Sequence, residues 1–147
     1  MLIALIAATL LAFLAGQALP KAIVAAPAFW AHLVLAVGVM TLITAAMQHF
    51  VPVLTRSRGA GRWTVRLPWL MLAAGGLALA VFYGWLDFVW ITAAAVLALA
   101  GVIGMLSWMR NKAHNTLGKP HPGLAWYVAA MACLGLGLIA AAAMPWL

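Results

Sequence analysis

The side chains in this chain that could do chemistry are its histidines. There are four of them: His32, His49, His114 and His121. A neutral imidazole can bind haem iron as an axial ligand, and it can also bind copper or zinc. The chain has one acid and one cysteine, and it contains no zinc-protease, Walker or Ser-His-Asp pattern. These absences disfavour an autonomous hydrolase or ATPase and direct attention to ligand binding by histidine.

The composition places these histidines in a membrane protein. Of the 147 residues, 69% are hydrophobic and 6% are charged, whereas soluble domains run roughly 45–50% apolar and about 25% charged. So few charged side chains cannot solvate a globular surface, which excludes a soluble protein, a disordered chain and a nucleic-acid binder. The expected partners are therefore the lipid bilayer and other membrane subunits.

Five apolar stretches are long enough to cross a bilayer, which takes about 20 mostly apolar residues each. They cover approximately residues 2–19, 28–51, 67–84, 88–109 and 123–146. The predicted fold is all-α, a polytopic transmembrane bundle of five helices that forms one integral membrane domain over residues 1–147. No basic residue precedes the first stretch, which is also long for a signal peptide, so we interpret it as a retained helix.

The basic residues predict the orientation of the bundle. All but one of them lie in two connecting segments on the same side: Arg56, Arg58, Arg62, Arg66, Arg110, Lys112 and Lys119. Only Lys21 lies on the other side. Because basic loops stay in the cytoplasm, we expect a bacterial-type inner membrane protein with a cytoplasmic amino terminus and an external carboxyl terminus.

Small residues spaced four apart indicate how the helices pack, since they let helix backbones approach closely in lipid. Three stretches carry such stripes: Gly76, Ala80 and Gly84; Ala100 and Gly104; and Ala129, Cys133, Gly137 and Ala141. The stripes predict contacts between helices of this chain, or a contact between one stripe and a partner subunit.

Polar side chains concentrate in the second stretch, and its two histidines differ in depth. His32 lies about one turn inside the outer end, where it could bind haem or serve only as an interfacial polar group. His49 lies near the inner end, roughly 25 Å away along a straight helix, so one haem cannot bridge the two. His121 begins the fifth stretch and could face His49, which makes this pair a weaker candidate site. His114 is expected to be a solvated loop residue.

The second stretch also resembles a known family. Residues 31–55 read AHLVLAVGVMTLITAAMQHFVPVLT, with His32 near the outer end, then Gly38, and a closing Val51-Pro52 pair. This pattern resembles the second helix of the haem–copper oxidase catalytic subunits, closest to the cbb3-type and nitric-oxide-reductase-like branch, and is similar to histidine-led helices of NnrS-type membrane haem proteins. The resemblance implies that His32 is an axial ligand of a low-spin b-type haem. It also implies a short relative or an amino-terminal fragment, since the later histidines of those subunits have no counterpart here.

Two functions follow as hypotheses. The first is a membrane subunit that binds haem b through His32, for electron transfer or gas sensing within a larger complex and without catalysis of its own. We then expect the other ring nitrogen of His32 to have a hydrogen-bond partner, Phe29, Leu35 and Ala36 to line the porphyrin edge, and the opposite axial ligand to come from another chain. The second is a non-catalytic accessory subunit or assembly factor without a cofactor. A transporter ranks last, because no acid lies within the membrane.

Overall fold

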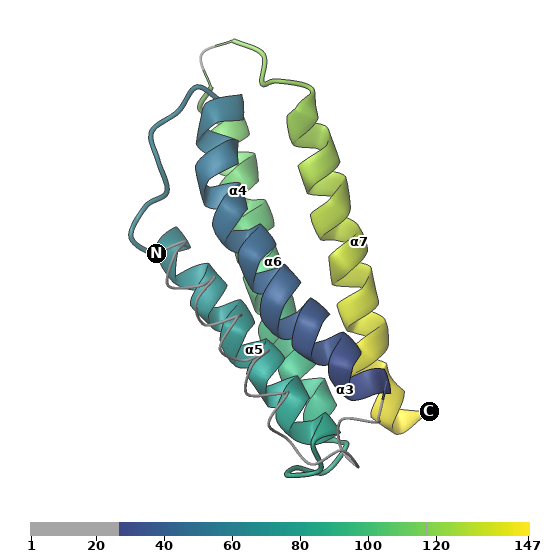
Figure 1. The fold of residues 1–147 in the computed structure, drawn as a ribbon. Coiled ribbons are helices and arrows are strands. Elements are labelled where there is room, and N and C mark those ends of the chain that lie inside the picture. The colour runs from purple at the N-terminus through teal and green to yellow at the C-terminus, as the bar shows by residue number, and fades with distance from the viewer. Residues whose placement is uncertain (1–26, 117) are drawn as a thin grey trace.

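The computed structural model describes residues 27–116 and 118–147, which form helices and contain no β-strand. Four of these helices are long and apolar enough to cross a membrane: Ala28–Leu54, Thr64–Phe82, Trp90–His114 and Gly123–Trp146. They form an elongated bundle (Figure 1). The predicted all-helical fold is thus confirmed for the described residues, and each of the last four predicted stretches forms a helix that could span a membrane. The first stretch, residues 2–19, lies outside the described residues.

Each long helix is built from consecutive helical elements, and Figure 1 labels the α-helices among them. The first joins α3 (Pro27–Ala31), a π-helical segment η1 (His32–Val39) and α4 (Met40–Leu54). The second joins a short η2 (Thr64–Arg66) to α5 (Leu67–Phe82), the third is α6 (Trp90–His114), and the fourth joins α7 (Gly123–Ala143) to η3 (Met144–Trp146). The helices depart from the predicted spans mainly at the basic end, where α6 continues past Met109 to His114. Lys112 and His114 in its last turn favour this extension, because cations stabilise the negative end of a helix.

Both basic loops lie at the same end of the bundle. The Lys112 ammonium donates hydrogen bonds to the backbone carbonyls of Arg58 (2.5 Å) and Gly59 (3.4 Å). The His121 amide donates to the carbonyl of Leu54 (3.1 Å). The opposite end holds the short connection between α5 and α6. The structure therefore gathers the basic residues of both segments on one side, as the charge pattern predicted.

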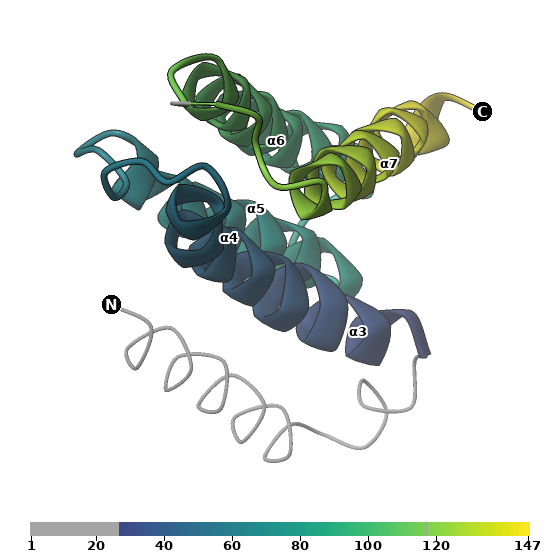
Figure 2. The ribbon, with the colours of Figure 1, turned by 90° about the horizontal axis from the view of Figure 1, so that it is seen from above.

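The helices pack mainly against their neighbours in the chain. Helix α5 contacts both the first helix and α6, and α6 contacts α7. Figure 2, seen along the bundle, shows α4 beside α5 and α6 beside α7. Helix α7 is the least buried of the four long helices. In its most apolar segment 11% of the residues are buried within the bundle, against 33–39% in the other three helices.

The interior differs between the two ends of the bundle. Toward the basic end, flexible methionine side chains fill the core: Met47, Met71, Met105, Met109 and Met131. Toward the other end, a second and smaller cluster of buried residues lies between α5 and α6: Ala78, Val81, Ile91 and Ala94. This second region leaves the space in which the candidate site lies.

Several members of the predicted small-residue stripes make no close contact with another described helix. A Cβ atom built on Gly76 or Gly137 would meet no described atom within 4 Å. The adjacent Gly75 packs instead, because a Cβ there would lie 2.5 Å from the Ala36 carbonyl oxygen. A four-residue spacing defines a stripe but not the neighbour it faces, and these helices carry small residues on more than one side.

The stripes in α6 and α7 also have exposed members. Ala100 is exposed, and its neighbour Gly101 packs against Met71 instead. In α7, Ala129 and Cys133 are exposed, whereas Gly135 faces Val102 and Leu99. Three predicted members do face the interior: Ala80 is half-buried, Gly104 lies under Leu67, and Ala141 lines the cavity described below. A fourth, Gly84, ends α5.

Candidate functional site

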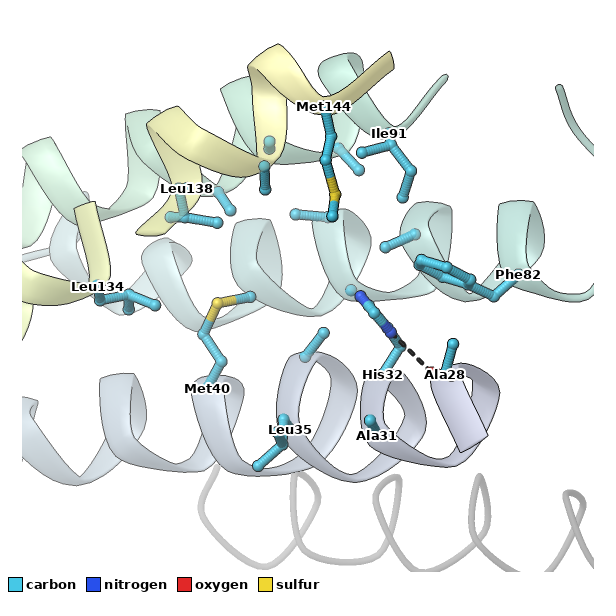
Figure 3. Close-up of a pocket in the computed structure, with 18 of the residues that line it drawn as sticks. Ala28, Ala31, His32, Leu35, Met40, Phe82, Ile91, Leu134, Leu138 and Met144 are labelled. Atoms are coloured by element: carbon cyan, nitrogen blue, oxygen red, sulfur yellow. Dashed lines mark hydrogen bonds between the residues drawn. The ribbon is translucent and has the colours of Figure 1, made fainter. Parts of the chain in front are cut away.

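A cavity of about 520 Å³ lies between the first helix and helices α5, α6 and α7 (Figure 3). Its volume falls within the roughly 300–1,000 Å³ that is typical of small-molecule and cofactor sites. Its walls are almost entirely apolar and rich in alanine: Ala28, Ala31, His32, Leu35, Ala36, Met40, Ala74, Gly75, Ala78, Phe82, Phe88, Ile91, Ala94, Ala95, Ala98, Leu134, Leu138, Ala141 and Met144. Among these residues, His32 is the one with a polar side chain.

The imidazole of His32 is held in place from two sides. Its Nδ1 atom lies 2.7 Å from the carbonyl oxygen of Ala28, one turn earlier. Because a carbonyl oxygen can only accept, Nδ1 carries the proton, and in a neutral imidazole Nε2 is then left with a free lone pair. The ring also stacks on Phe82 of α5, with centroids 3.9 Å apart and planes 30° apart. Figure 3 shows the ring reaching into the cavity.

The backbone around His32 is unusual in the same place. Residues His32–Val39 wind as a π-helix, a conformation that is rare and often found at functional sites. The Met40 amide donates to the carbonyl of Leu35, five residues earlier, which closes this segment. The first helix approaches α5 closely here, since Ala36 rests on Gly75. The cavity wall thus combines a wide helical turn with a close helix contact.

The structure agrees with two of the three neighbours expected around His32. Leu35 and Ala36 line the cavity. Phe29 does not, because it is 1% exposed and packs on Tyr83, with ring centroids 6.2 Å apart. Phe29 therefore packs at the end of α5 and is not among the residues that line the cavity.

The histidines at the basic end lie in a different environment. His49 is exposed and contacts Phe50 edge-on, with centroids 5.7 Å apart. His121 is also exposed, and its Nδ1 accepts a hydrogen bond from the Gly123 amide (3.1 Å) at the start of α7. In the described residues, no group of three or more His, Cys, Asp or Glu side chains gathers where it could hold a metal ion. His114, expected in a loop, is instead exposed in the last turn of α6.

Most other polar groups of the first helix have partners within the bundle. Thr44 donates to the Met40 carbonyl (2.7 Å), and the Gln48 side-chain amide donates to the Thr64 carbonyl (2.5 Å). The buried Thr41 hydroxyl has no partner among the described residues. These groups lie in the helix contacts rather than on the cavity wall, so His32 remains the polar group of the site.

Sequence reasoning missed two residues of this site, Phe82 and Met144. Neither stands near His32 in the sequence, and no local pattern marks either one. Their signal lies in the topology: the predicted orientation already brings the start of the second span and the ends of the third and fifth spans to the same side of the membrane.

Comparison of the chain with protein-family models, with curated proteins and with solved structures finds no match. The resemblance to haem–copper oxidase and NnrS-type helices therefore stays a prediction from the residues of the second span alone.

Proposed function

We propose that this protein is a membrane subunit that binds a b-type haem in the cavity through Nε2 of His32. The observation that carries the proposal is the state of the imidazole, with Nδ1 bonded to the Ala28 carbonyl and Nε2 left free beside an apolar cavity. Histidines that bind metals usually donate their other ring N–H to a carboxylate, a backbone carbonyl or water, which fixes the ring.

The remaining walls suit a flat, largely apolar macrocycle. The short alanine side chains leave room between the helices, and Phe82 offers an aromatic face beside the imidazole. When bound, the haem would supply one-electron redox chemistry or gas binding at its iron. The protein residues would contribute the axial nitrogen, the orientation of that nitrogen and a low-dielectric surround that excludes water. We propose electron transfer or gas sensing within a larger complex, with no catalysis by this chain alone.

We further propose that the protein lies in a bacterial-type inner membrane with its basic end in the cytoplasm. This orientation would put His32 near the outer face, the amino terminus in the cytoplasm and the carboxyl terminus outside. Reporter fusions after Arg58 and after Lys112 should both report the cytoplasm, and a fusion after Leu147 should report the outside. Fusions after Arg58 and Lys112 that report opposite sides would contradict this orientation.

An absorption spectrum of the purified protein tests the cofactor. The wild type should show a Soret band that shifts on reduction with dithionite. His32→Ala should abolish this band, whereas His49→Ala and His121→Ala should leave it intact because both side chains lie away from the cavity. Loss of the band in His49→Ala and His121→Ala, with retention in His32→Ala, would move the site to the basic end.

A second candidate function is a non-catalytic accessory subunit or assembly factor without a cofactor. The outward face of α7 favours it, because Ala129, Cys133 and Gly137 are exposed there and permit close approach by another helix. A featureless visible spectrum, together with a smaller complex on native gels for Gly137→Leu, would support this function over haem binding.

A further inference from the structure

The cavity has a second side chain that can bind iron, and it comes from the other end of the sequence. Met144 begins η3, directly after α7, and it lines the same cavity as His32. Figure 3 shows the two side chains entering the cavity from opposite sides, Met144 from α7 and His32 from the first helix. A methionine thioether is a soft, neutral ligand that pairs with histidine on haem iron in cytochromes c.

Hydrogen bonds hold the chain around Met144 against α6. The Thr92 hydroxyl donates to the carbonyl of Ala142 (2.9 Å), two residues before Met144. The indole N–H of Trp146, two residues after it, donates to the same hydroxyl (3.2 Å). One threonine therefore fixes both flanks of Met144, although Met144 itself is an exposed residue. Within a membrane such bonds between helices constrain where a side chain can lie.

The other donor on the cavity wall is poorly placed for this role. Met40 belongs to the same long helix as His32 and lies eight residues further along it. Two axial ligands must approach the iron from opposite sides, which requires facing elements. Among the residues that line the cavity, Met144 is the donor that faces His32 from a different helix.

We infer that the Met144 sulfur is the second axial ligand of the haem, opposite Nε2 of His32. This inference rests on the proposed function. It places both ligands in one chain, whereas the positions of the histidines alone predict a second ligand from another chain. A six-coordinate His–Met iron has no open position for a gas, so the inference favours electron transfer over gas sensing. It also predicts a higher reduction potential than two histidines would give.

Met144→Leu tests the inference, because leucine preserves the volume of methionine and removes the sulfur. Purified Met144→Leu should still bind haem, but its midpoint potential should fall and its ferrous form should gain carbon monoxide binding that the wild type lacks. Met47→Leu, in the methionine core away from the cavity, serves as the matched control and should match the wild type in both measurements. Met144→His should restore six coordination and block carbon monoxide, at a lower potential than the wild type.

The outcomes separate the two proposals. A Met144→Leu protein that keeps the wild-type potential and carbon monoxide behaviour overturns the Met144 assignment and leaves His32 as a ligand. The Met144 assignment is also overturned if Met40→Leu, and not Met144→Leu, alters the midpoint potential and carbon monoxide binding. A wild-type protein without haem overturns both the assignment and the proposed function.

Discussion

The two ends of this bundle show what makes a membrane histidine a candidate ligand. At the basic end, methionines fill the core, His49 is exposed, and the Nδ1 of His121 accepts the amide of Gly123. At the other end, small residues leave a cavity, and His32 presents one bonded and one free nitrogen beside it. Position along the helix does not distinguish His32 from His49, since each lies near one end of the first long helix. The difference is the hydrogen bonding of the ring and the space next to it.

Disrupting the close helix contact beside that cavity gives the largest expected effect on folding. Gly75→Leu should lower the free energy of unfolding by about 3 kcal/mol, the upper part of the range for overpacked sites. A Cβ there would already lie 2.5 Å from the Ala36 carbonyl oxygen and 3.0 Å from the Val37 Cα, and backbone cannot move aside cheaply. Gly76→Leu is the control, because a Cβ there would meet no atom of the described residues within 4 Å. Denaturant unfolding in detergent measures both, and equal stabilities would remove the close helix contact that shapes the cavity.

A smaller effect is expected for the glycines of α7, which decide which face of that helix packs. Gly135→Leu should destabilise the bundle by about 1.5 kcal/mol, because the side chain must displace Val102 and Leu99. Gly137→Leu should leave the stability of the isolated chain nearly unchanged, since its surroundings are open among the described residues. The reverse order would restore the stripe of Ala129, Cys133 and Gly137 as the packed face.

The helix ends at the two sides of the bundle offer the smallest effects, of opposite sign. Gly84 ends α5 at φ +85°, with the Trp85 amide bonded to the Ala80 carbonyl (3.0 Å). Arg56 ends α4 at φ +46°, a conformation that costs a residue with a side chain roughly 1–2 kcal/mol. Gly84→Ala should therefore cost about 1 kcal/mol. Arg56→Gly should gain about 0.5 kcal/mol, because the greater freedom of unfolded glycine offsets part of the relief. Thermal or denaturant unfolding measures both, and a loss of stability in Arg56→Gly would contradict the capping account.

The sequence predicted the parts of this fold that depend on composition along the chain. Long apolar runs identify the four described helices, and Arg56 to Arg66 together with Arg110 to Lys119 identify the loops that share one end. Which side of each helix packs against its neighbours was not predictable in the same way. Gly75 and Gly76 are chemically alike, and only the position of Ala36 decides which one packs.

The candidate site also has parts that the sequence predicts and parts that depend on the packing of distant helices. His32 was predictable, because an imidazole in an apolar helix is costly and stands out. The cavity was not, because its walls come from four helices, and the π-helical winding of His32–Val39 uses residues that equally suit an α-helix. Met144 was missed because the search for a second ligand considered only histidines at that depth.

The central claim, that His32 is the ligand and not merely part of the fold, is tested most directly by chemical rescue. The measurement is the haem content per polypeptide of wild-type, His32→Gly, and His32→Gly purified with added imidazole. The account predicts haem in the wild type, its loss in His32→Gly, and its return with imidazole, which would occupy the space vacated beside Phe82. Equal haem content in the wild type and His32→Gly, or no haem in the wild type, would contradict it.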